Sequence, residues 1–135
     1  MSVPKPERNE SGADFVFYAR ELAGFTVKKC VNTIPKRYTF YYGQKIAGYA
    51  IEAYAFASDA NDRWPTNADQ ARDRLKLLLD ARGRITRVIS LIELADSDVH
   101  FPANVMKEWM KLATTELKLL KGTIDSDRQR FKFGE

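Results

Sequence analysis

The sequence has little of what disulfide bonding, secretion or membrane insertion would require. Its 135 residues include a single cysteine, Cys30, so no internal disulfide can form and a reducing cytoplasm is the expected compartment. No uncharged apolar run approaches the ~20 residues that span a bilayer, and no membrane association is expected. The first residues contain no apolar segment of signal-peptide length.

Motifs that would indicate catalysis or metal binding are also missing. The chain has no HExxH, CxxC, GxSxG or glycine-rich phosphate loop, and it lacks the ExxH spacing of metal sites in helical bundles. The only histidine, His100, falls in a short turn and is expected to be a surface residue. Cys30 has apolar neighbours and is expected to be a buried, inert thiol. We therefore expect a protein that is not an enzyme and binds neither a metal nor a cofactor.

Acidic residues are absent from one long stretch of a chain whose net charge is only +4. Between Leu22 and Ile51 there are five basic residues and no acidic ones. The five are Lys28, Lys29, Lys36, Arg37 and Lys45. Such a local excess of positive charge is compatible with nucleic-acid binding but does not establish it.

Apolar residues recur at three- and four-residue steps along four stretches, which predicts four amphipathic helices. The expected helices cover residues 13–32, 36–60, 68–96 and 102–124, with a turn at 97–101. Together they predict an all-α, up-down-up-down four-helix bundle over residues 13–124. Residues 1–12 are expected to be a disordered lead, and residues 125–135 a polar tail. The last helix has a bundle-type seam formed by Met106, Trp109, Ala113, Leu117, Leu120 and Ile124.

The corner around Pro35 and the helix after it are unusual. Pro35 ends one helix and can start the next. Lys36 and Arg37 then occupy the first turn, where the helix dipole disfavours cations. From Ile46 to Ala57 the only charged residue is Glu52. A helix that is apolar on all sides is normally buried on more than one side, which indicates a central bundle helix or a subunit interface.

Basic and aromatic residues are mixed at this corner, and two interpretations remain open. Tyrosines beside lysine and arginine can stack on unpaired bases, but aromatic residues at helical spacing belong more often to a core or an interface. Lys36, Arg37, Tyr38 and Lys45 are the best local candidates for contact with a phosphate chain.

The third predicted helix carries further basic residues on one outer face. Arg72, Lys76 and Arg87 share that face, where aspartates interleave with them. This mixture is typical of a solvated, self-paired surface, although phosphate contact is the other interpretation. The predicted nucleic-acid-binding residues are therefore Lys28, Lys29, Lys36, Arg37, Tyr38, Lys45, Arg72, Lys76 and Arg87.

Two arginines of the same helix, Arg74 and Arg82, fall close to the centre of its apolar face. A charge in that position must snorkel to solvent or find a partner. Pairing across subunits, with Glu52 or Asp80, is one interpretation, and phosphate contact in a shared groove is the other. The residues predicted at an oligomer interface are Tyr49, Glu52, Phe56, Arg74 and Arg82.

A resemblance to a known family rests on the run FYARELAGFTVKKCVNTIPKRYTF, from Phe17 to Phe40, followed by QKI and an alanine-rich helix that ends in ANDR. The chain resembles a family of small four-helix bundle proteins that includes the accessory variability determinant (Avd) proteins of diversity-generating retroelements. The proteins encoded in intervening sequences of ribosomal RNA genes belong to the same family. The likeness covers residues 15–124 and is most specific in the first helix and the PKRY that follows. LKLLKGTIDSD stands where related sequences often carry a Trp-centred basic stretch.

The resemblance implies a homo-oligomeric barrel of five subunits with a positively charged surface and no catalytic activity. It also implies association with the reverse transcriptase of the element and with its template RNA, with DNA or an RNA/DNA hybrid as a further partner, in support of mutagenic cDNA synthesis. Only Pro35, Lys36, Arg37 and Tyr38 carry over position by position. The alternative is a structural or protein-binding helical oligomer without nucleic-acid affinity.

Overall fold

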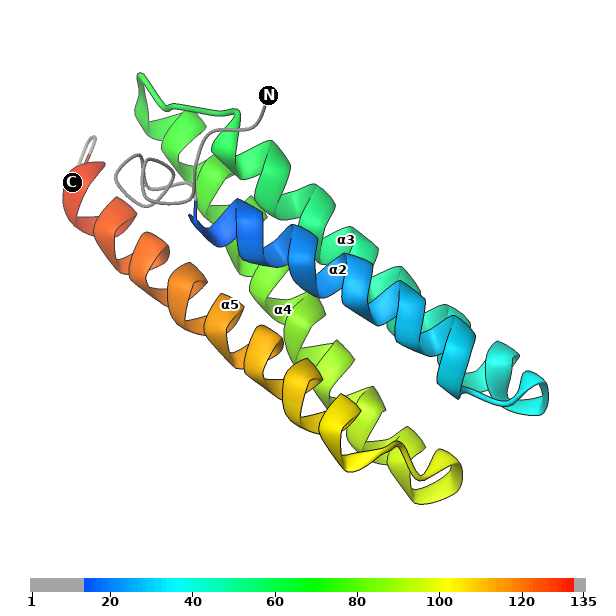
Figure 1. The fold of residues 1–135 in the computed structure, drawn as a ribbon. Coiled ribbons are helices and arrows are strands. Elements are labelled where there is room, and N and C mark those ends of the chain that lie inside the picture. Colours follow the sequence, from blue (N-terminus) through cyan, green and yellow to red (C-terminus); the bar gives the residue numbers. More distant parts are fainter. Residues whose placement is uncertain (1–13, 133–135) are drawn as a thin grey trace, which may run out of the picture.

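The computed structural model describes residues 14–132, which are helical over almost their whole length (Figure 1). The elements are α2 (Asp14–Thr33), a 3₁₀ turn η1 (Lys36–Tyr38), a π-helical segment η2 (Thr39–Gly43), α3 (Gln44–Asn61), α4 (Ala68–Val99) and α5 (Ala103–Arg130). No strand occurs among these residues. The all-α prediction is therefore confirmed.

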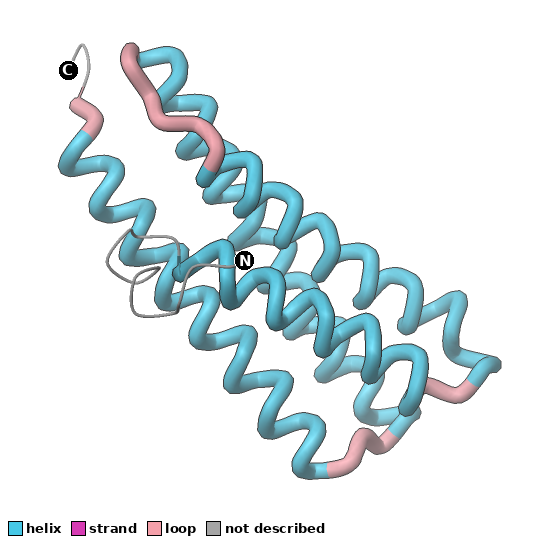
Figure 2. Tube along the Cα trace, turned by 45° about the horizontal axis from the view of Figure 1, so that its top comes forward, coloured by secondary structure: helices cyan, strands magenta, loops and turns pink. Residues whose placement is uncertain are grey.

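The four long helices run alternately in opposite directions and are joined by short connections (Figures 1 and 2). Each helix packs against the next one in sequence, and α2 also packs against α5, which closes the arrangement. This is the geometry expected of a four-helix bundle. Within the described range, no helix is both long and apolar enough to cross a membrane.

The packing of α3 against α4 follows from two complementary seams. The buried positions of α4 alternate in steps of three and four and carry mainly branched side chains, whereas those of α3 carry mostly alanine. Small residues on one helix allow close approach of the larger side chains on the other. The α4 seam consists of Arg74, Leu78, Ala81, Ile85, Val88, Ile92 and Ala95. The α3 seam consists of Ile46, Ala50, Ala53, Ala57 and Ala60.

Trp109 anchors α5 to α2. Its indole nitrogen donates a hydrogen bond of 2.8 Å to the Thr26 hydroxyl oxygen, and both side chains are fully buried. The indole ring also makes edge contacts with Phe25 and Phe101, at centroid distances of 6.1 and 5.2 Å. A buried tryptophan combines a large apolar area with one polar group that needs a partner, and Thr26 supplies that partner.

Several element ends differ from those predicted. α4 continues to Val99, and the chain turns at His100, whose φ of 57° is in the left-handed region. Asp96 stabilises the turn because its carboxylate accepts a hydrogen bond of 2.8 Å from the Phe101 amide. The predicted helix at 36–60 starts instead as η1 and η2, so regular α-helix begins only at Gln44.

The largest difference concerns the predicted polar tail at 125–135. α5 continues through this region to Arg130. Asp127, one turn beyond Ile124, is buried and occupies the next position of the helix seam. Only residues 131 and 132 of the described chain follow the helix. The predicted lead at 1–12 lies outside the described residues.

Candidate functional site

The basic residues of the acid-free stretch lie on the last turns of α2, on η1 and at the start of α3. Pro35 is extended, with φ −57° and ψ 148°, and its carbonyl accepts a hydrogen bond of 2.9 Å from the Tyr38 amide. This turn follows α2 directly and leads into η2 and α3. We call the group of Lys28, Lys29, Lys36, Arg37 and Lys45 the basic corner. Four of its members are exposed, and Lys29 is half-buried.

The charges of the basic corner are not neutralised within residues 14–132, because no ion pair there includes any of the five. Two of the cations lie over aromatic rings instead. The Lys29 ammonium is 5.4 Å from the ring centre of Phe25, and the Arg37 guanidinium carbon is 5.0 Å from that of Tyr38. Cation–π contact stabilises a cation without cancelling its charge. The corner therefore keeps its attraction for anions.

Four aromatic residues near the basic corner form two pairs, one packed against the protein and one exposed to solvent. Tyr38 and Tyr42 are half-buried, with ring centres 5.7 Å apart. The Tyr42 hydroxyl donates a hydrogen bond of 2.5 Å to Asp98 at the end of α4. This bond, above all, raises the pKa of Tyr42 above its ordinary value. Phe40 and Tyr41 are 68% and 63% exposed, so these two rings are the ones available for stacking.

Helix periodicity did not identify Phe40 and Tyr41 as the available rings, although it predicted Tyr38 as a binding residue. The reason is the π-helical segment Thr39–Gly43. A π turn accommodates one extra residue and rotates the side chains on either side of it relative to one another. A regular helical wheel drawn through residues 36–60 therefore assigns the wrong faces at this corner.

The predicted binding residues of α4 do not join the basic corner. Arg72 forms an ion pair with Asp69, and the Arg87 guanidinium carbon lies 5.4 Å from the ring centre of Tyr49. Lys76 is exposed. Asp98, which contacts the corner through Tyr42, follows Arg72 by 26 residues, or about 39 Å of helix. The predicted set therefore forms two separate regions.

Three predicted interface residues, Tyr49, Glu52 and Phe56, gather along the outer α3–α4 seam. Glu52 accepts a hydrogen bond of 2.6 Å from the Arg84 guanidinium, whose carbon is 5.2 Å from the ring centre of Phe56. Sequence reasoning missed Arg84 because no spacing rule links residues 32 positions apart. The three side chains remain partly exposed.

Arg82 lies apart from this seam. Its side chain is exposed, and its charge contributes slightly to lowering the pKa of Asp125 on α5, which is lowered mainly by the hydrogen bond from Lys121. Arg82 therefore faces α5 rather than Glu52. Glu52, one of the two partners predicted for Arg82, is bound instead by Arg84 of the same chain.

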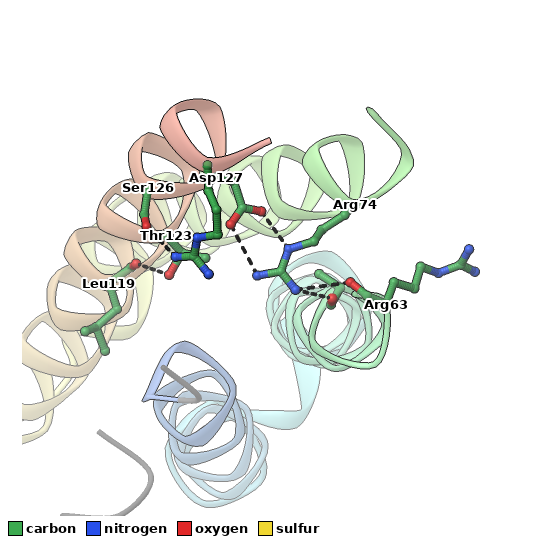
Figure 3. Close-up of polar contacts among 8 residues, drawn as sticks. Arg63, Arg74, Leu119, Thr123, Ser126 and Asp127 are labelled. Atoms are coloured by element: carbon green, nitrogen blue, oxygen red, sulfur yellow. Dashed lines mark hydrogen bonds and ion pairs between the residues drawn. The ribbon is translucent and has the colours of Figure 1, made fainter. Parts of the chain in front are cut away.

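The structure corrects the prediction that Arg74 pairs across subunits (Figure 3). Arg74 is only 5% exposed, and its Nε donates a hydrogen bond of 2.6 Å to Asp127 of α5. Its Nη1 also donates to the carbonyls of Ala60 and Arg63, at 2.7 and 3.3 Å. Because these in-chain groups use the guanidinium, Arg74 belongs to the bundle interior. Arg74 lies near the centre of the apolar face of α4 and therefore needs a charged partner, which is the carboxylate of Asp127.

Glu116 of α5 is a second buried acid that sequence reasoning missed. It is fully buried, and neither carboxyl oxygen has a hydrogen-bond partner in the described part of the chain. Burial raises its pKa to about 9, so the group is protonated at neutral pH. A signal was present, because Glu116 and Asp127 continue the steps of the seam through Trp109, Leu120 and Ile124. The seam predicted from apolar residues alone contained Leu117 in place of Glu116.

Comparison with known proteins adds no relative to these observations. No family model, no curated protein and no solved structure matches this chain. The family resemblance drawn from the sequence accordingly stays a prediction.

Proposed function

We propose that this protein is a non-enzymatic accessory protein of a diversity-generating retroelement, which binds template RNA and its cDNA and supports the reverse transcriptase. The observation that carries the proposal is the basic corner. Its five cations have no carboxylate partner among residues 14–132, and the exposed rings of Phe40 and Tyr41 lie on η2, which directly follows the η1 turn that carries Lys36 and Arg37. Unneutralised cations beside exposed aromatic rings are the combination that binds single-stranded nucleic acid.

Assembly into a ring of five subunits is part of the same proposal. The outer α3–α4 seam offers Tyr49, Glu52 and Phe56 as a partly exposed surface for a neighbouring copy. Arg84 orders that surface by contacting both Glu52 and Phe56. Repeating one corner around a ring would multiply the contacts available to one RNA strand.

The test of nucleic-acid binding is a salt titration with a structured RNA carrying single-stranded loops, followed by fluorescence anisotropy. The wild-type affinity is expected to fall steeply between 50 and 200 mM salt. In a Lys36→Ala, Arg37→Ala variant, the salt slope should decrease by about 1.4, because each lost contact to a single-stranded phosphate removes about 0.7. An Arg128→Ala, Lys132→Ala variant removes the same charge from exposed positions at the far end of α5 and should keep the wild-type slope. Affinity that is independent of salt would contradict the electrostatic account.

Light scattering tests the assembly on the same samples. A species with about five times the mass of the chain is expected, and a monomer at all concentrations would contradict the ring. Both double variants should keep the wild-type mass, because they change positions outside the α3–α4 seam.

A structural or protein-binding oligomer without nucleic-acid affinity is the second candidate function. It is favoured by the outer face of α4, where Arg72 and Arg84 are already paired with acidic residues of the same chain. This candidate predicts a stable oligomer that does not bind the RNA at physiological salt. In that case Glu52→Ala should disturb assembly, whereas the basic-corner variant should have no effect.

A further inference from the structure

A second surface lies beside the basic corner, between the last turns of α2 and the start of α3. It is an open groove of about 450 Å³, which we call the α2–α3 groove. Its apolar lining comes from Val27, Cys30, Val31, Ile34 and Ala47, and Lys36 lies at its margin. Ile34 and Cys30 are buried beneath it. Burial raises the pKa of the Cys30 thiol to about 12, so the floor of the groove carries no charge at neutral pH.

The walls of the groove expose apolar side chains that nothing in the described chain covers. Val31 is 76% exposed, and Val27, one turn before it on the same face of α2, is 36% exposed. Beyond the groove on α3, Ile51 lies one turn after the lining residue Ala47 and is 51% exposed. Together these residues form an apolar strip along two adjacent helices. A contiguous strip of this kind, in contrast to scattered exposed residues, is typical of an interaction site.

The charge around the groove has one sign. Lys36 lies at its margin and is the charged residue of the lining. No acidic residue occurs between Leu22 and Ile51, which includes every lining residue. The next acid on α3, Glu52, is bound by Arg84 on the α4 side of the helix. An occupant should therefore present apolar groups to the floor and negative charge to the rim.

An amphipathic helix satisfies both requirements. From Val27 to Ile34 the α2 wall covers seven residue steps, or about 10 Å, which matches two turns of a docked helix. Apolar side chains at positions i and i+4 of that helix would lie on its groove-facing side. A nucleic-acid strand fits less well, because most of the lining is apolar and only Lys36, Thr39 and Gln44 offer polar side chains to base edges.

We infer that the α2–α3 groove docks an amphipathic helix of a partner protein, whose apolar i, i+4 anchors are flanked by acidic residues. The inference rests on the proposed function to the extent that an accessory protein needs a protein partner. It names the surface that receives this partner and the chemistry that the partner must have.

The test uses the full-length protein to select binders from a displayed library of helical peptides with randomised positions. The selected peptides should share two apolar residues four positions apart with Asp or Glu beside them. Val31→Asp should weaken their binding at least tenfold. Leu94→Asp is the matched control, because Leu94 is likewise exposed, at 56%, but lies on α4. It should leave the affinity unchanged, and thermal unfolding should show that both variants are folded.

Four outcomes would overturn the inference. These are no selected peptides, selected peptides without acidic enrichment, binding that Val31→Asp does not weaken, and a change of molecular mass in Val31→Asp, which would mean that a second copy covers the groove. Failure of the proposed function is distinguishable, because in that case the peptides would still bind while RNA affinity is absent.

Discussion

The two ends of the bundle use similar residues in opposite ways. At one end, Trp64 has the guanidinium carbons of Arg74 and Arg130 at 5.6 and 5.2 Å from its ring centre. At the other end, Arg37 lies over Tyr38 at 5.0 Å. Arg74 is buried against a carboxylate, whereas Arg37 is exposed and has no carboxylate partner within residues 14–132. Arg74 is thus structural and Arg37 is available for a ligand, because a carboxylate faces only the first of the two.

The helix termini reinforce this contrast. Arg74 donates to carbonyls at and just beyond the end of α3, where the helix dipole is negative and favours a cation. Lys36 and Arg37 stand at the start of the helical segment that leads into α3, where the dipole is positive and disfavours them. The fold therefore stabilises the charge of Arg74, whereas the charges of Lys36 and Arg37 are left to solvent or to a ligand.

The largest effect is expected where the charge is buried. Asp127→Ala would leave the Arg74 guanidinium buried without its counterion and should lower the free energy of unfolding by about 3–5 kcal/mol. Asp125→Ala removes an exposed carboxylate that pairs with Lys121 four residues earlier in the same helix, and should cost less than about 1 kcal/mol. Urea denaturation measures both. Equal effects would mean that the carbonyls of Ala60 and Arg63 suffice for Arg74.

Glu116 should make stability depend on pH. Its pKa is about 9 in the folded protein against an ordinary value of 4.5, so between these values the folded state retains a proton that the unfolded state has released. The contribution of Glu116 is therefore complete at low pH and is lost as pH rises through this window, by at most about 1.4 kcal/mol per pH unit. Urea denaturation at several pH values should show that Glu116→Gln removes this slope. An unchanged slope would assign it to other groups.

Aromatic residues at the two ends should differ in RNA binding. Phe40→Ala with Tyr41→Ala removes the exposed rings of the basic corner and should weaken binding of single-stranded RNA by about tenfold or more, because stacking contributes roughly 1–3 kcal/mol per base. Trp64→Ala should leave RNA affinity unchanged, although this ring is 60% exposed, because it lies at the end of the bundle opposite the basic corner. Anisotropy titrations give both affinities. If both variants lost the same RNA affinity, the two ends of the bundle would not differ in RNA binding.

The smallest effect is expected for the link between the basic corner and α4. Tyr42→Phe removes the hydrogen bond to Asp98 and should reduce stability by about 1 kcal/mol or less, because the bond is exposed. Tyr41→Phe removes a hydroxyl from a neighbouring exposed ring and should have no measurable effect on the melting temperature. If the two variants melt alike, the Asp98 contact does not hold the corner in place.

Much of the fold followed from local pattern. The helices, the break at Pro35 and the all-α class could be predicted because three- and four-residue periodicity and proline geometry act over a few residues. The acid-free stretch from Leu22 to Ile51 could be read directly from the order of residues. The end of α5 was missed because Asp127, although it continues the three- and four-residue steps of the seam, is polar and its partner Arg74 lies 53 residues away.

Partners and faces depended on the packing of the helices. Asp127 lies 53 residues from Arg74, and Glu52 lies 32 residues from Arg84. No sequence spacing specifies such pairs, because they form only when helices from different parts of the chain lie side by side. The same holds for the α2–α3 groove, since its two walls belong to different helices. Periodicity sets which residues share a face of one helix, and packing sets which faces meet, which charges are neutralised and which remain free to bind.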